Sequence, residues 1–231
     1  MREIILDTET TGLSPQDGHR IVEIGAIELL NHLPTGKTFH VYLDPGRDMP
    51  KEAEAVHGLS SAFLKGKPRF AEKAGEFLTF IEDSVLVIHN ASFDMNFINS
   101  ELLVAGKTQI DPGRVIDTLQ MARRKHPMAQ NSLDALCKRY GIDLSKRTMH
   151  GALLDSELLA EVYLELLGGR QTTFGLGAPE VKKPSLSVGS RPAPKSRPMP
   201  LPPRLTSDER MRHAVLVKEL GEKSLWPIDG Q

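Results

Sequence analysis

Near the start of the chain, EIILDTETTGL, residues 3–13, combines an apolar run with the acidic residues Asp7 and Glu9. An apolar-rich run leads into Asp7, Thr8 and Glu9, which predicts a buried strand that ends at a polar edge. Residues two apart on a strand point to the same face, so Asp7 and Glu9 project together where open α/β sheets bind ligands. Two adjacent like charges are unfavourable unless a cation lies between them, so the pair indicates a cation site. The alternative is a polar strand end at the surface.

Around this stretch, short β-rich runs alternate with amphipathic runs up to about residue 167. The predicted strands are 3–8, 21–30, 39–44 and 85–88. The predicted helices are 69–82, 92–105, 131–140 and 151–167. Three early strands at close spacing, followed by strand–helix alternation, indicate an α/β fold with a mixed sheet flanked by helices.

A third acidic residue, Asp94, lies in HNASFDMNF, residues 89–97, directly after the predicted strand 85–88. Phe93 and Phe97 form an i, i+4 apolar pair on the helix that begins here. If those rings face the core, Asp94 projects from a neighbouring face toward the strand ends. The alternative is that Asp94 is only a first-turn partner of the helix dipole.

The fourth acidic residue, Asp155, follows His150 by five positions in HGALLD. Gly151 between them indicates that His150 lies on a loop and that Asp155 lies on the helix that follows. A loop histidine with the ordinary pKa of about 6.5 is suited to accept a proton from water near neutral pH. The alternative is a histidine that is simply solvated.

Taken in order, LDTETTGL, HNASFDMNF and HGALLDSELLAEVYLEL closely resemble the three motifs of the DEDDh exonucleases. More narrowly, they resemble the family of proofreading epsilon subunits of bacterial DNA polymerase III, and the resemblance extends from residue 3 to about 176. It implies an RNase H-like fold with a mixed five-stranded sheet flanked by helices. It also implies a 3′→5′ exonuclease that hydrolyses mismatched nucleotides from DNA 3′ ends that are single-stranded or frayed.

The same resemblance implies roles for individual residues. The implied ligands of two divalent ions are Asp7, Glu9, Asp94 and Asp155. Asp94 would hold the second ion directly or through water, and His150 would be the general base. The residues implied to contact the terminal nucleotide are Asp7, Glu9, Asp155 and, from PKEAEAVHGLS, Glu52 and His57. The alternatives for the last two are a surface carboxylate and a helix-end histidine. Oxygen ligands favour Mg²⁺ or Mn²⁺ over zinc.

Composition restricts the class of protein. The chain has 231 residues and one cysteine, Cys137, which excludes an internal disulfide framework and fits a reducing cytoplasm. The first residues do not form a signal peptide, and no run approaches the roughly 18 apolar residues of a membrane span, so no membrane partner is expected. The net charge of −1 excludes a broad electrostatic attraction to nucleic acid. Contact with DNA must therefore be local.

The end of the chain has a different composition. Residues 178–203 contain 8 of the 16 prolines, together with Gly, Ser, Lys and Arg, which is typical of an extended, mobile tether. Beyond it, Thr206 and Glu209 form a capping box that predicts a short helix. The predicted parts are an exonuclease domain at 1–170, a flexible Pro-rich linker at 171–204 and a polymerase-binding segment at 205–231.

Two partners are expected for this C-terminal part. Gln171, Phe174 and Leu176 resemble the Q-x-x-Φ-x-Φ peptide that docks on bacterial sliding clamps; the alternative is a Gly-rich exit from a helix. The small apolar element at 205–226 is too short to build its own core, which predicts folding onto another protein. In the resembling family, that protein is the catalytic (alpha) subunit of the polymerase. The alternative is packing against the chain's own domain.

Two other functions share some of these features. A DEDDh RNase that trims short RNA 3′ ends carries the same three motifs, but it has no need of a tether and a partner-binding tail. A nuclease-dead scaffold could keep the fold, but it would not need all five catalytic positions. The sequence leaves open which ion is used and whether a small accessory (theta-like) subunit is present.

Overall fold

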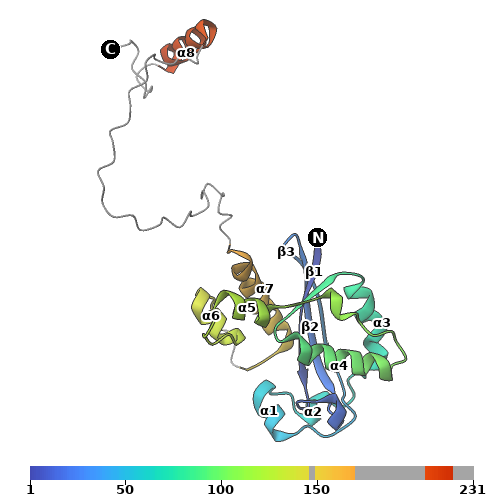
Figure 1. Cartoon of the computed structure of the whole chain (residues 1–231). Coiled ribbons are helices and arrows are strands. Elements are labelled where there is room, and N and C mark those ends of the chain that lie inside the picture. The colour runs from blue at the N-terminus through green and yellow to red at the C-terminus, as the bar shows by residue number, and fades with distance from the viewer. Residues whose placement is uncertain (146–148, 170–205, 221–231) are drawn as a thin grey trace. The chain divides into compact units, whose positions relative to one another are not determined.

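The computed structural model describes residues 1–145, 149–169 and 206–220, and the chain divides into two units, Met1–Leu176 and Gly177–Gln231. The first unit is built on a five-stranded sheet with helices on both sides (Figure 1). Its strands are β1 (Arg2–Thr10), β2 (Ile21–Leu30), β3 (Leu33–Tyr42), β4 (Val85–Ile88) and β5 (Val115–Asp117). None of the helices in the described ranges is long and apolar enough to span a membrane.

The strand order is β3-β2-β1-β4-β5, and the sheet is mixed. β1 pairs antiparallel with β2, and β2 pairs antiparallel with β3, whereas β1, β4 and β5 run parallel. The C-terminal ends of these three parallel strands therefore meet at one edge, where ligand sites form in such sheets. The predicted mixed sheet is confirmed, and a ligand site is expected at the edge formed by the C-terminal ends of β1, β4 and β5.

Helices cover both faces of the sheet, so β1 is buried on both sides. Ile4 and Leu6 pack in one core and Ile5 packs in another, as strand alternation requires. The helices of the first core are α3 (Phe70–Ile81) and α4 (Ala91–Val104). Those of the opposite side are α5 (Thr118–Lys125), α6 (Leu133–Tyr140) and α7 (Ala152–Leu167). Each fully buried Ile or Leu contributes roughly 1.5–3 kcal/mol.

Apart from β3, the predicted strands and helices agree with the structure within two residues, and the elements that the sequence analysis missed are short. The missed elements are β5, α5, α1 (Lys51–His57), α2 (Ser61–Leu64) and the 3₁₀ turns η1 (Pro15–Asp17) and η2 (Pro112–Arg114). A strand of three residues is too short to show a period. The third strand begins at Leu33 rather than at residue 39, because its exposed first half contains Pro34 and Gly36, which obscure the strand pattern.

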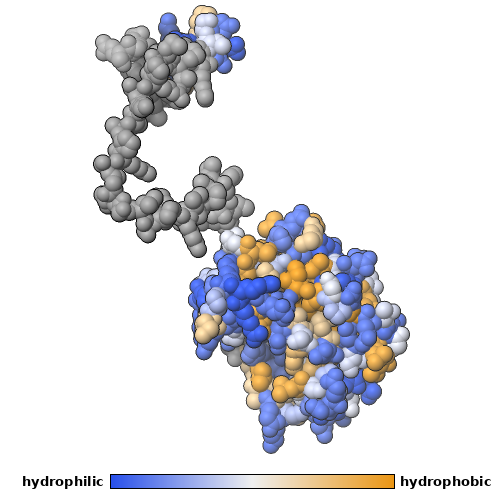
Figure 2. Space-filling view, viewed as in Figure 1, coloured by the Kyte–Doolittle hydropathy of each residue, from blue (hydrophilic) through white to orange (hydrophobic). Residues whose placement is uncertain are grey.

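The helices α5 and α6 carry a local concentration of basic side chains, although the net charge of the chain is −1. The exposed basic residues are Arg123, Arg124, Lys125, Lys138 and Arg139. On the face shown in Figure 2, the strongest hydrophilic colour lies over these two helices. Lys125 also joins α5 to α7, because its Nζ donates to the carbonyl of Glu165 at 2.5 Å.

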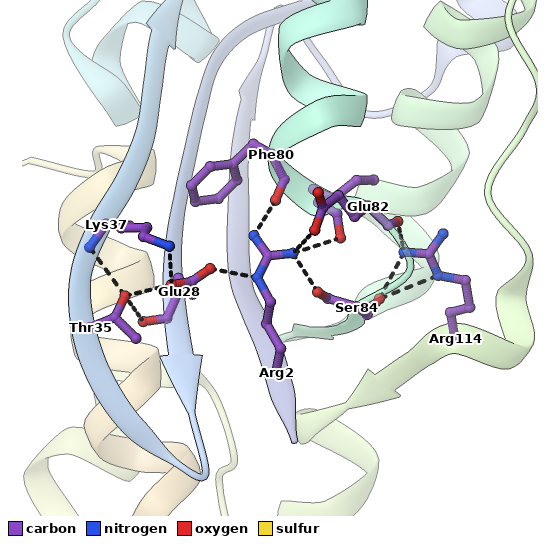
Figure 3. A network of polar contacts seen from close by, with 9 residues as sticks. Arg2, Glu28, Thr35, Lys37, Phe80, Glu82, Ser84 and Arg114 are labelled. Carbon is purple, nitrogen blue, oxygen red and sulfur yellow. Dashed lines mark hydrogen bonds and ion pairs between the residues drawn. The ribbon is translucent and has the colours of Figure 1, made fainter.

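At the N-terminal end of β1, Arg2 is the centre of a network of polar contacts (Figure 3). Its Nε lies 2.5 Å from Oε2 of Glu28, and its other nitrogens donate to the carbonyl of Phe80 at 2.6 Å and to Oγ of Ser84 at 2.7 Å. The hydroxyl of Thr35 also donates to Glu28, at 2.8 Å. Hydrogen bonds from Arg2, and then from Thr35, lower the pKa of Glu28 to about 2. This network joins β1 to β2 and to the turn before β4.

The described part of the second unit is the helix α8 (Ser207–Leu220). The backbone N–H of Thr206 donates to Oε2 of Glu209 at 2.8 Å, and that of Glu209 donates to Oγ1 of Thr206 at 3.3 Å, so the predicted capping box is confirmed. Of the residues of α8, only Val217 is buried. Met211, Val215 and Leu216 are exposed. The predicted linker at 171–204 lies outside the described residues.

Candidate active site

Asp7 and Glu9 lie in the C-terminal half of β1, where the antiparallel register sets them opposite Gly25 and Glu23 of β2. The pKa of Asp7 is raised well above its ordinary value, first by burial and then by the nearby carboxylates of Asp94, Glu9 and Asp155. No lysine or arginine of the described residues forms a salt bridge with Asp7. Burial and the nearby carboxylates therefore disfavour the ionised form of Asp7.

Asp94 lies in the first turn of α4 and is almost fully buried. The rings of Phe93 and Phe97 are 5.2 Å apart on the core side of this helix, which leaves Asp94 facing β1. One oxygen of Asp94 accepts from both the backbone N–H of Thr8, at 3.1 Å, and the hydroxyl of Thr8, at 2.7 Å. Burial raises the pKa of Asp94 to about 7 in spite of these hydrogen bonds. Asp94 is therefore held against Thr8, near the carboxylate of Asp7.

His150 and Asp155 meet at the start of α7. Gly151 is the N-cap of that helix, so His150 lies on the preceding loop and Asp155 lies in the first turn. Nδ1 of His150 is 3.1 Å from Oδ2 of Asp155. The backbone N–H of His150 donates to the carbonyl of Val56 in α1, at 3.3 Å. Ligand atoms of Glu9, His150 and Asp155 all lie within 4.8 Å of one another, a spacing that could hold a metal ion.

The position of Asp155 depends on a close approach between α7 and β2 at Gly25. A Cβ atom on Gly25 would lie 2.2 Å from the backbone carbon of Ala152, so no other residue fits without moving the helix. Next to Asp155, the buried hydroxyl of Ser156 donates to the carbonyl of Gly25 at 2.9 Å. Because Gly25 lies opposite Asp7, this contact sets the spacing between the first and the last acidic motif. The sequence analysis missed Gly25 and Ser156, although a glycine inside a predicted strand is itself a signal of close backbone approach.

A cavity of about 570 Å³ opens beside Glu9 and runs along α1. Glu52 and His57, both predicted to contact substrate, line it together with Phe93. Glu52 is exposed, whereas His57 is buried and its Nδ1 accepts from the backbone N–H of Leu59 at 3.0 Å. Burial lowers the pKa of His57. The ring is therefore neutral at pH 7, and its proton is on Nε2.

The loop after β1 forms another wall of this cavity, which the sequence analysis did not identify. Its lining residues are Thr10, Thr11, Gly12, Leu13, Asp17 and His19. Leu13 is 86% exposed and contributes an apolar side chain to this wall. The predicted clamp-binding residues Gln171, Phe174 and Leu176 lie outside the described residues.

The donor set fits divalent cations. Four carboxylates offer oxygen atoms of the kind that such cations bind, and the imidazole of His150 lies 3.1 Å from one of them. The raised pKa values of Asp7 and Asp94 show that nearby like charges and burial disfavour their ionised forms. A hard divalent cation bound among these oxygens would reverse that balance.

Comparisons with known proteins agree with this geometry. A family model described as "Exonuclease" matches residues 4–163. The DNA polymerase III subunit epsilon of Rickettsia prowazekii (strain Madrid E) is 60% identical over 177 residues, which cover 75% of this chain and 77% of the relative. The subunit epsilon of Escherichia coli (strain K12) is 50% identical over 176 residues, which cover 73% and 72% of the two chains.

Two solved structures extend the comparison to the fold. Exonuclease X in complex with 5′ overhanging duplex DNA is 26% identical, with a TM-score of 0.56, and the match covers 71% of this chain and 90% of that one. The nuclease domain of 3′hExo, a DEDDh family member bound to rAMP, has a TM-score of 0.63 at 19% identity and covers 72% and 91%. The second likeness shows the fold alone, and that fold is the one predicted.

Proposed function

This chain belongs to the exonuclease family, and within it to the epsilon subunits of DNA polymerase III, and on that premise we propose how its site works as a proofreading 3′→5′ DNA exonuclease. The observation that carries the proposal is the convergence of carboxylates from β1, α4 and α7 with one loop histidine. The relatives do not support an RNase that trims RNA ends, because those that match three quarters of the chain are DNA polymerase subunits.

The proposed metal ligands are Asp7, Glu9, Asp94 and Asp155, which would hold two divalent ions. Their oxygen atoms are typical of Mg²⁺ and Mn²⁺ sites rather than zinc sites. When bound, such ions supply positive charge that offsets the charge of the phosphodiester and lowers the pKa of the attacking water. The protein's part is to hold the four carboxylates at fixed positions, through the register of β1 and the close contact at Gly25.

His150 is the proposed general base. Its Nδ1 is 3.1 Å from the carboxylate of Asp155, which only accepts hydrogen bonds when it is ionised, so the ring proton is on Nδ1. Nε2 then carries the lone pair that would accept the proton from water. The ring is exposed at the rim of the site, where it can release that proton to solvent.

The cavity beside Glu9 is the proposed site for the terminal nucleotide, with Glu52 and His57 in contact with it. The neutral His57 offers a donor at Nε2. A mismatched end has already lost part of its pairing and stacking, so it enters such a cavity at lower cost than a paired end. Proofreading selectivity follows from that difference.

A time course on primers with paired or mismatched 3′ ends tests this function. We expect nucleoside monophosphates to be released in Mg²⁺ or Mn²⁺, faster from the mismatched primer, and no release in EDTA. An RNA oligomer of the same sequence and an Asp155→Asn variant are the controls. Activity that persists in EDTA, or faster digestion of the RNA, would overturn the proposal.

We propose further that the chain consists of a nuclease domain at 1–170, a linker at 171–204 and a segment at 205–231 that binds the catalytic (alpha) subunit. In α8, Met211, Val215 and Leu216 are exposed, and an apolar helix surface of this kind fits binding to another protein. A chain truncated after residue 170 should keep its nuclease activity and fail to co-elute with the alpha subunit. Co-elution of the truncated chain would overturn this assignment.

Gln171, Phe174 and Leu176 are proposed to contact a sliding clamp. Replacing all three with alanine in the full-length chain should remove co-elution with the clamp and leave binding to the alpha subunit unchanged. Unchanged co-elution with the clamp would contradict the proposal. The linker would act by raising the local concentration of the nuclease near the primer end.

A further inference from the structure

We propose that His19 is a substrate-binding residue, which donates a hydrogen bond from Nε2 to the base of the terminal nucleotide. This inference rests on the proposed function, because it takes the cavity beside Glu9 as the nucleotide site. His19 lines that cavity from the loop between β1 and β2, and Glu52 and His57 line it from α1. His19 contributes the only imidazole that this loop supplies to the cavity lining.

The loop that carries His19 is held firmly in place. The backbone N–H of Thr11 donates to the carbonyl of Arg20 at 2.9 Å, and the backbone N–H of Arg20 donates back to the hydroxyl of Thr11 at 3.0 Å. Two nitrogens of Arg20 in turn pair with the buried carboxylate of Glu101 on α4, at 2.6 and 2.5 Å. The helix that carries Asp94 therefore also fixes the base of this loop. An anchored loop holds a side chain for a ligand with little loss of entropy on binding.

The imidazole of His19 is also positioned by Gly12. A Cβ atom on Gly12 would lie 2.3 to 2.5 Å from three atoms of the ring, so the ring occupies the space that a side chain at residue 12 would need. Gly12 and Leu13 line the same cavity. The ring is half-buried rather than free in solvent. The glycine thus gives His19 a fixed place in the cavity wall.

Hydrogen bonding assigns the proton of the ring. The hydroxyl of Thr11 is fully buried, accepts from the backbone of Arg20, and lies 3.1 Å from Nδ1 of His19. Its own proton needs an acceptor, since an unsatisfied buried donor is costly, and Nδ1 is the acceptor in range among the described contacts. Nδ1 therefore accepts, and the ring proton is on Nε2. No hydrogen bond formed within the described residues uses Nε2 of His19, which leaves this donor available to a ligand.

A single donor at this place suits an enzyme that removes any nucleotide. Every base presents an acceptor on its minor-groove edge, at O2 of a pyrimidine or at N3 of a purine. A hydrogen bond to that acceptor gives affinity without sequence preference. Oxygens of the sugar and phosphate offer the same chemistry, so the test must separate them from the base.

The test compares His19→Asn with His19→Gln in the full-length chain. The amide of asparagine replaces Nδ1 and keeps the contact with Thr11, whereas the amide of glutamine replaces the Nε2 donor. We expect His19→Asn to raise the KM for single-stranded DNA, and the Kd for dTMP measured by calorimetry in Mn²⁺, by about 5- to 10-fold, with kcat nearly unchanged. His19→Gln should stay near the wild-type values. An abasic 3′ end should remove the difference between the two variants.

The opposite results overturn the proposal. If His19→Asn behaves like the wild type while His19→Gln is impaired, or if both lose thermal stability and activity together, His19 only supports the loop. A difference that persists on the abasic end assigns the contact to sugar or phosphate and rejects the base. His126, whose Nε2 bonds the hydroxyl of Tyr140 at 2.6 Å outside this cavity, provides the matched control, and His126→Asn should leave KM unchanged. A wild-type chain that binds dTMP but does not degrade DNA would reject the proposed function separately.

Discussion

The two ends of β1 handle charge in opposite ways. At the N-terminal end, Arg2 pairs with the buried Glu28 and donates to two further elements (Figure 3). At the C-terminal end, five residues along the same strand, Asp7 lies near the carboxylates of Asp94 and Glu9. At the N-terminal end the buried carboxylate is paired with basic side chains. At the C-terminal end carboxylates surround Asp7, and no lysine or arginine of the described residues forms a salt bridge with it.

The pKa values record this difference. Hydrogen bonds from Arg2 lower the pKa of Glu28 to about 2, whereas burial raises that of Asp94 to about 7. The protein therefore stabilises the ionised carboxylate at one end and opposes it at the other. The Arg2 end contributes to stability, and the Asp7 end is arranged for function and leaves the positive charge to ions from solution.

The largest expected effect is at the acidic end. Asp7→Asn should lower the rate of DNA digestion by about 10³-fold or more, because a proposed metal ligand is lost. In EDTA the same variant should unfold at a higher temperature than the wild type, because it relieves repulsion with Asp94 and Glu9. Normal digestion would contradict the role of Asp7 as a metal ligand, and a lower unfolding temperature in EDTA would contradict the repulsion between these carboxylates.

The next effect separates the proton acceptor from the carboxylates. His150→Ala should lower turnover by roughly 10²–10⁴-fold, because the proposed general base is lost. Its binding of Mn²⁺, measured by calorimetry, should fall less than that of Asp155→Asn. If turnover is retained, another group accepts the proton, and if both variants lose Mn²⁺ equally, His150 is itself a ligand.

At the opposite end the expected effect is on stability alone. Arg2→Met should lower the free energy of unfolding by about 2–3 kcal/mol, because the buried Glu28 would lose its nearest cation and keep only the exposed Lys37, at 3.3 Å. Urea titration measures this loss, while kcat at 25 °C should not change. Lys73→Met is the matched control, since Lys73 pairs with the exposed Glu76 at 2.7 Å and should cost no more than about 0.5 kcal/mol. A fall in kcat for Arg2→Met would mean that the two ends are not independent.

The smallest effect is a dependence on pH. The pKa of Glu28 is depressed in the folded chain, so its ionised form stabilises the fold above its ordinary pKa of 4.5 and loses that effect as the pH falls toward 2. Glu28→Gln should therefore be less stable than the wild type at pH 6, and the difference should shrink steadily below pH 4.5. A difference that is constant from pH 6 to pH 2.5 would show that packing, and not charge, is responsible.

The sequence allowed the acidic positions to be predicted because local patterns carry them. Strand alternation pairs Asp7 with Glu9, and a glycine before a helix separates His150 from Asp155. The contacts that support these residues could not be predicted in the same way. Ser156 and Gly25 are 131 positions apart, and no periodic pattern indicates that the hydroxyl of Ser156 donates to the carbonyl of Gly25 or that the backbone of Ala152 comes so close to it.

The short elements were missed for a related reason. β5 and α1 have three and seven residues, so tertiary contacts rather than local propensity decide their structure. The cavity wall that holds His19 also depends on packing, because its place is set by Gly12 and by the distant Glu101. Motif order therefore predicts the proposed catalytic residues, whereas the cavity lining depends on packing between distant segments.

The support of the His150 loop has a consequence for how such a site can evolve. The backbone of His150 is joined to the last turn of α1 through Val56, and α1 also carries Glu52 and His57 into the cavity. A substitution that shifts the backbone of α1 would therefore act on the proposed nucleotide contacts and on the proposed general base together. Affinity for the DNA end and turnover would then be coupled through α1, so that selection on one of them constrains the other.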